Sequence, residues 1–151
     1  MCNVAHALGA ARRYKQSIES FFEILLLFGE TLPRSSGEKK LRTGLYQIIR
    51  FLLSTSDDSI YGMTECSNKN IATLINVYVG LAHVLHYEQP WQVGSVSLRM
   101  VELTLKTGLS AKSSLAFAHF GGVLVVEGFV GEGCRLGESY PYVFPAKMLF
   151  I

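Results

Sequence analysis

The spacing of apolar residues is the feature that most constrains how this chain folds. In the clearest stripe, large apolar residues recur three or four positions apart, at Ile18, Phe21, Phe22, Leu25 and Phe28. This spacing places them on one face of an α-helix. Similar stripes run through residues 41–52, 71–85 and 93–105, and residues 110–119 are helix-like. The sequence therefore predicts an all-α fold.

Glycine and proline residues indicate where two of these helices end. Gly29 and Gly108 each follow the last apolar position of a stripe. A left-handed residue is favoured there, and glycine adopts that conformation easily. Pro33 then prevents the first helix from resuming. Both helices are therefore expected to stop at their glycine.

Serine and proline residues indicate where three later helices begin. We expect Ser67 to cap the helix through residues 71–85, and Ser110 to cap the helix over 111–127. Pro90 is expected in the first turn of the helix through residues 93–105, where its missing N–H costs nothing. Residues 57–67 have no clear period and are expected to form an ordered connection.

Residues 115–126 are apolar nearly all round, so this helix is expected to be the most buried of the set. β-Branched residues crowd positions 122–126, which could instead form a strand. The preceding helix-like segment has no turn before Gly121, and this favours a helix. The expected architecture is a stack of antiparallel helix pairs, with about six helices and a truncated seventh. It comprises one helical repeat-like domain over residues 1–138 and an irregular, proline-containing tail over 139–151.

Composition limits the classes of partner. The 151 residues are 49% hydrophobic and 17% charged with a net charge of +2, so we expect a folded chain that does not bind nucleic acid. The apolar runs at 21–28 and 115–126 are too short to span a membrane, and no signal peptide opens the sequence. The three cysteines, Cys2, Cys66 and Cys134, have no disulfide-framework spacing. A cytoplasmic location is therefore expected.

A glycine-rich segment, Gly128-Phe-Val-Gly-Glu-Gly-Cys-Arg-Leu-Gly137, invites a dinucleotide-binding interpretation. Such a site needs a strand, a G-x-G-x-x-G turn, a helix that faces the phosphates, and an acidic residue about 20 positions later. Gly137 comes one position late, and only 14 residues follow it. Glycines that form turns and close contacts explain the segment better.

Ser36-Gly-Glu-Lys39 and Lys106-Thr-Gly108 resemble the S-x-x-K and K-T-G motifs of penicillin-recognising enzymes. That chemistry needs the serine at a helix start inside a cleft and the K-T-G on a strand. Here the second motif closes a predicted helix, so the context does not fit.

His83 and His86 lie one turn apart, near Glu88, and could share a metal ion with Cys134. A zinc site needs a third and usually a fourth ligand, and no C-x-x-C or H-E-x-x-H motif supplies them. Histidines near a helix C-terminus, where the dipole favours them, are the better explanation. His119, on the apolar helix, is expected to be a hydrogen-bonded core residue. We therefore assign no catalytic, cofactor-binding or metal-binding residue and expect no enzymatic activity.

Residues 14–25 resemble the second helix of a tetratricopeptide unit, with Tyr14 opening the helix, Ser17 as its small residue and Phe21 filling the groove. The resemblance implies that residues 3–11 form the first helix of that unit. Residues 128–137 fit the same template, with Val130 in the opening position and Gly133 as the small residue. The helix over 111–127 would then be their partner.

Three segments in order, Leu27-Phe-Gly-Glu-Thr-Leu-Pro33, residues 97–108 and residues 109–118, are similar to the helical region of large multidomain signalling ATPases. In that family an AAA-type ATPase, often behind a serine/threonine-kinase domain, precedes this region, and sensor domains with a histidine kinase or cyclase follow it. The resemblance covers residues 3–137. It implies a non-catalytic scaffold that binds a protein partner or transmits movement between domains.

This chain departs from that family after Gly137, where the family continues as a long helix. Pro141 and Pro145 prevent such a helix here, and the catalytic segments of the family are missing. We therefore expect a fragment of a larger protein, or a reading frame that ends in a misread tail. Two alternatives stay open: a free-standing adaptor that binds a partner protein, and a small metal-dependent enzyme centred on His83, His86 and Cys134.

Overall fold

The computed structural model describes residues 1–31 and 38–138. Within these residues the regular elements are helical, which confirms the predicted all-α class. Residues 122–126 are helical as expected. The elements are α1 (Cys2–Ala10), α2 (Tyr14–Leu27), α3 (Glu38–Ser54), α4 (Asp57–Tyr61), α5 (Lys69–Glu88), the 3₁₀ turn η1 (Pro90–Gln92), α6 (Val93–Thr107), α7 (Ser113–Val126) and α8 (Val130–Glu138).

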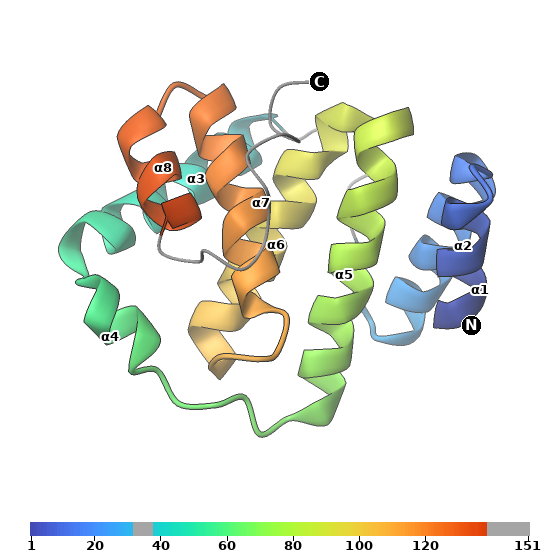
Figure 1. Ribbon diagram of the computed structural model, residues 1–151, viewed down its shortest axis with the longest axis horizontal. Helices are drawn as coiled ribbons and strands as arrows, with labels where there is room; N and C mark the ends of the chain where they lie inside the picture. The colour runs from blue at the N-terminus through green and yellow to red at the C-terminus, as the bar shows by residue number, and fades with distance from the viewer. Residues whose placement is uncertain (32–37, 139–151) are drawn as a thin grey trace.

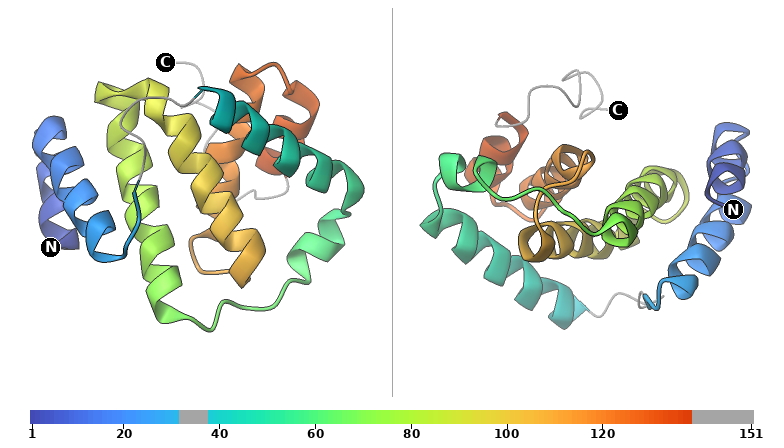
Figure 2. Two further views of the ribbon diagram at one scale, coloured as in Figure 1. Left: turned by 180° about the vertical axis from the view of Figure 1, so that it is seen from behind. Right: turned by 90° about the horizontal axis from the view of Figure 1, so that it is seen from below.

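The helices form a row in which α5, α6, α7 and α8 each run opposite to the one before (Figure 1). The pair α1 and α2 packs on α5 and closes one end of the row, and α8 lies at the other end (Figure 1). Helix α3 crosses the back of the row and contacts α6 and α8 (Figure 2). Short turns after α1 and α7 make their partner helices close neighbours.

Two groups of buried apolar side chains form the core. The N-terminal cluster joins α1, α2, α5 and α6 with Ala116 of α7, and its largest members include Phe21, Leu25, Ile75, Tyr78 and Met100. The C-terminal cluster joins α3, α4, α6, α7 and α8, and includes Leu52, Val101, Phe117, Phe120 and Leu124. Helix α6 contributes to both clusters from different faces.

Three helix starts differ from the predictions. Asn68, not Ser67, caps α5: its side-chain oxygen accepts hydrogen bonds from the N–H groups of Asn70 at 3.0 Å and Ile71 at 3.3 Å. Helix α7 begins at Ser113, because residues around Ser110 form a turn first. Pro90 opens η1 and lies outside α6.

The expected connection over residues 57–67 contains the short helix α4, which the sequence did not predict. Beyond it, the backbone is held by Leu109: Cys66 N–H donates to Leu109 O at 2.7 Å, and Leu109 N–H donates to Thr64 O at 2.9 Å. Gly108 has a φ of 101°, and a Cβ there would collide with the Thr64 carbonyl. Both features require glycine at this turn. Gly29, with a φ of 74°, confirms the other predicted helix end.

The prediction that residues 115–126 form the most buried helix is wrong. Val126 is 85% exposed and Val125 is 40% exposed, although Phe117 and Phe120 on the same helix are fully buried. Helix α7 packs mainly on α6 and α8 and touches α5 less, so part of its surface has no neighbour among the described residues. Helices α5 and α6 lie between partners on both sides and bury a larger share of their residues.

Among the residues that the structure describes, no helix is long and apolar enough to cross a membrane. The predicted irregular tail over residues 139–151 lies outside the described residues.

Candidate functional site

The histidines that sequence analysis singled out lie where α5 faces α7. His86 of α5 stacks on His119 of α7, with 5.6 Å between ring centroids and 24° between ring planes. His83 instead meets Tyr87 edge-on at 5.9 Å. Cys134 is exposed on α8. Over residues 1–31 and 38–138, no three His, Cys, Asp or Glu side chains come close enough to hold a metal ion. The structure therefore joins His86 to His119, which the sequence did not pair.

Burial controls the charge of this histidine pair. Burial, together with smaller contributions from the nearby His86 and His83, lowers the pKa of His119 to about 4. Burial and His83 also lower the pKa of His86. The pair is therefore neutral at pH 7 and packs α5 against α7.

The glycine-rich segment has no strand before it, because residues 113–126 are helical. This overturns the dinucleotide-binding interpretation and favours the structural one. Gly128 has a φ of 92° and makes the turn between α7 and α8. Gly121 and Gly133 let these two helices cross closely: a Cβ at Gly133 would lie 2.6 Å from the Gly121 carbonyl oxygen.

Arg135, from the same segment, forms a second polar centre that the sequence did not predict. Its guanidinium donates to the carbonyl oxygens of Leu52 and Thr55, each at 2.7 Å, and to the Asp57 carboxylate at 2.8 Å. The two carbonyls belong to the end of α3 and the residue after it, where regular helical hydrogen bonds run out; within the described residues the Leu52 carbonyl otherwise accepts only a long bond from the Thr55 N–H, at 3.4 Å. This group, the Arg135 network, ties α8 to α3 and α4.

Of the two motifs that resemble those of penicillin-recognising enzymes, the second lies at the end of a helix and not on a strand. Lys106 and Thr107 close α6, and the Thr107 hydroxyl donates to the Leu103 carbonyl at 2.8 Å. Ser36, the serine of the first motif, lies outside the described residues, so the structure does not test whether the two motifs come together.

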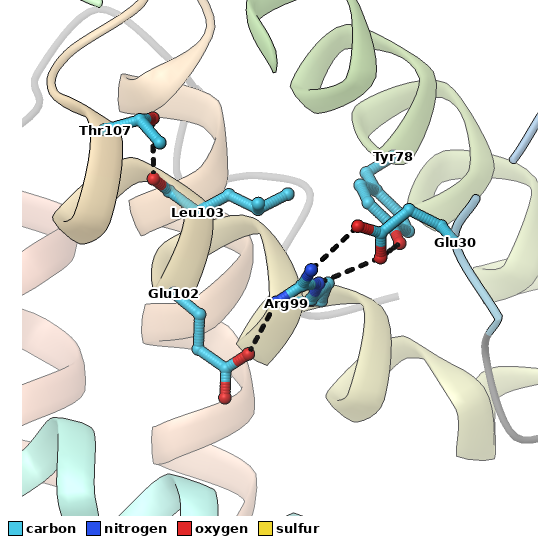
Figure 3. A network of polar contacts seen from close by, with 6 residues as sticks. All are labelled: Glu30, Tyr78, Arg99, Glu102, Leu103 and Thr107. Carbon is cyan, nitrogen blue, oxygen red and sulfur yellow. Dashed lines mark hydrogen bonds and ion pairs between the residues drawn. The ribbon is translucent and has the colours of Figure 1, made fainter. Parts of the chain in front are cut away.

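The third polar centre surrounds Glu30, just after α2 (Figure 3). Its carboxylate accepts hydrogen bonds from Arg99 Nη2 at 2.7 Å, from Arg99 Nε at 2.9 Å and from the Tyr78 hydroxyl at 2.7 Å. Arg99 also pairs with Glu102 at 3.4 Å. This Glu30 network ties the end of α2 to α5 and α6.

The electrostatics of the Glu30 network oppose a proton-transfer role. The hydrogen bonds from Arg99 lower the pKa of Glu30 more than burial raises it. Burial and the Glu30 carboxylate raise the pKa of Tyr78 above its ordinary value of 10.0. Glu30 therefore stays ionised and Tyr78 stays protonated near neutral pH. The arrangement suits a structural tie.

Comparison with known proteins assigns no family. No family model, no curated protein and no solved structure matches this chain.

Proposed function

We propose that this chain is a non-catalytic helical scaffold with a tetratricopeptide-like stack, which acts as an interaction module of a multidomain signalling ATPase or kinase. Stacked helix pairs bury a continuous core and leave extended faces for a partner protein. The module would bind a partner or transmit movement between neighbouring domains.

The observation that carries this proposal is the packing of the two helix pairs that resemble tetratricopeptide units. Ser17, the small residue of the first, is fully buried and donates to the Ala5 carbonyl of α1 at 2.7 Å. Phe21 is fully buried in the N-terminal cluster. Gly133, the small residue of the second, lies against Gly121. In both pairs, the helices approach where the template has its small residue.

The test is to sequence the full transcript through both ends of this reading frame. An in-frame ATPase upstream, with a kinase or sensor domain downstream, is the expected result. Stop codons close to both ends would overturn the proposal and leave a free-standing adaptor as the better explanation, since the same fold serves both.

A further inference from the structure

Helix α1 presents a face of small apolar residues at one end of the row. Val4, Ala7 and Ala10 recur three positions apart and are exposed, and Val4 is 59% exposed. Ala5, on the other side of α1, is fully buried in the N-terminal cluster. The exposed face has no partner among the described helices.

Helix α8 presents a matching face at the opposite end. Gly131, Cys134 and Gly137 recur three positions apart and are exposed, beside Val130 at 54%. A Cβ placed on Gly131 or Gly137 would meet no described residue within 4 Å. A face this flat allows another helix to approach closely, as Gly133 does on the inner side of α8.

Because successive helices of the row run in opposite directions, the direction of α1 at one end can be compared with that of α8 at the other. The turn between α1 and α2 and the turn between α7 and α8 lie at the same edge, the upper one in Figure 1. Helix α8 runs away from that edge, and α1 runs toward it (Figure 1). An α1 placed beside α8 would therefore be antiparallel to it and would continue the row.

The charges at these two turns are opposite. Arg12 and Arg13 are exposed in the turn after α1. Glu127 is exposed in the turn after α7, and Glu132 lies partly exposed in the first turn of α8. Placing α1 of one copy beside α8 of another brings the two arginines to the edge that carries the two glutamates.

We propose that the partner at these ends is a second copy of this chain, bound end to end, with α1 of one copy packed on α8 of the next. The two surfaces differ, so the contact is heterologous. Such a contact adds one copy after another and gives either a closed ring or an open chain of copies. The contact uses the ends of the row and stands apart from the proposed scaffold function.

The first experiment measures the mass of the whole chain by sedimentation across a concentration series. The wild-type mass is expected to rise from one copy toward multiples. The double variant Arg12→Glu, Arg13→Glu should weaken association and raise the dissociation constant by about tenfold or more. Adding Glu127→Lys and Glu132→Lys should restore association, because the charges are then exchanged. Lys106→Glu with Lys112→Glu makes the same charge change at the opposite edge and is the matched control.

A wild-type chain that stays a single copy at every concentration would overturn the proposal. So would association that both double variants weaken equally, since that result would reflect net charge alone. Circular dichroism of each variant shows whether it is folded, and the wild-type series tests the proposal without any substitution.

The second experiment tests direction. In a Cys2→Ala, Cys66→Ser background, Ala7→Cys places one thiol on α1 and leaves Cys134 on α8. A short bis-maleimide should then link α1 of one copy to α8 of the next and give a ladder of dimers, trimers and longer products. Lys112→Cys in the same background should give no ladder. Products that stop at the dimer would mean a symmetric contact and would contradict the end-to-end arrangement.

Discussion

The two core clusters are joined to their surroundings by opposite chemistry. At the N-terminal cluster, the carboxylate of Glu30 gathers donors from Tyr78 of α5 and Arg99 of α6. At the C-terminal cluster, the guanidinium of Arg135 gathers acceptors from the end of α3 and from α4. Glu30 is therefore the shared acceptor in the first network, and Arg135 is the shared donor in the second.

This difference determines which groups lose their hydrogen bonds when Glu30 or Arg135 is substituted. The Glu30 network joins side chains. The partly exposed Arg99 can turn toward water when Glu30 is lost, although Tyr78 is fully buried. The Arg135 network satisfies main-chain carbonyls of Leu52 and Thr55, whose positions are set by the end of α3. The C-terminal cluster should therefore be more sensitive to the loss of its polar centre than the N-terminal cluster.

The largest expected effect tests whether the two clusters themselves are equivalent. Phe21→Ala in the N-terminal cluster and Phe117→Ala in the C-terminal cluster each remove a fully buried ring. Each should lower the free energy of unfolding by about 3–5 kcal/mol, because the cavity is only partly refilled. Urea denaturation measures both. A loss below about 1 kcal/mol for Phe21→Ala would mean that the stripe on α2 is misassigned.

The next effect tests the Arg135 network. Arg135→Met keeps most of the side-chain length but removes every donor, so it should lower the free energy of unfolding by about 2 kcal/mol. Arg50→Met, at an exposed position of α3, is the control and should change stability little. Equal values for the two variants in urea denaturation would show that the carbonyls of α3 do not depend on Arg135.

A smaller effect is expected from the Glu30 network. Glu30→Gln removes the negative charge and should lower the free energy of unfolding by about 1 kcal/mol, less than Arg135→Met. The exposed Glu23→Gln on α2 is the matched control. Because the pKa of Glu30 is lowered, its stabilisation is full above its ordinary value of 4.5 and disappears as the pH falls through the lowered pKa. A larger loss for Glu30→Gln than for Arg135→Met would reverse the comparison.

An effect of similar size, seen only when the pH is lowered, concerns the contact between α5 and α7. The pKa of His119 is lowered to about 4 in the folded chain, so the unfolded chain binds the proton first as the pH falls below about 6.5. Wild-type stability should therefore drop by about 1 kcal/mol more than that of His119→Gln between about pH 7.5 and 5.5. Urea denaturation at both pH values gives this difference. The same pH dependence in both chains would contradict it.

Periodicity predicted the helices because each stripe needs only local information. The stripe at Phe21 and Leu25 became α2, and the glycines at 29 and 108 end their helices as expected. Helix α4 was missed because five residues are too few for a period. Asn68 was missed as the cap of α5 because Ser67, beside it, is an equally suitable residue type.

The polar centres could not be predicted, since their members lie far apart in the sequence. Tyr78 is 48 positions from Glu30, and Arg135 is 83 positions from Leu52. Two of the partners of Arg135 are main-chain carbonyls, which exist at every position and leave no signal in side-chain identity. The pairing of His86 with His119 likewise depends on how α5 packs near α7, which neither stripe specifies.

The placement of α6 in both clusters bears on how the chain unfolds. Met100 belongs to the N-terminal cluster and Val101, the next residue, to the C-terminal cluster. Neither half can lose its packing without exposing one side of the same helix, so the two halves should melt in a single cooperative transition. Amide hydrogens along α6 should then exchange only through global unfolding and be the slowest in the molecule.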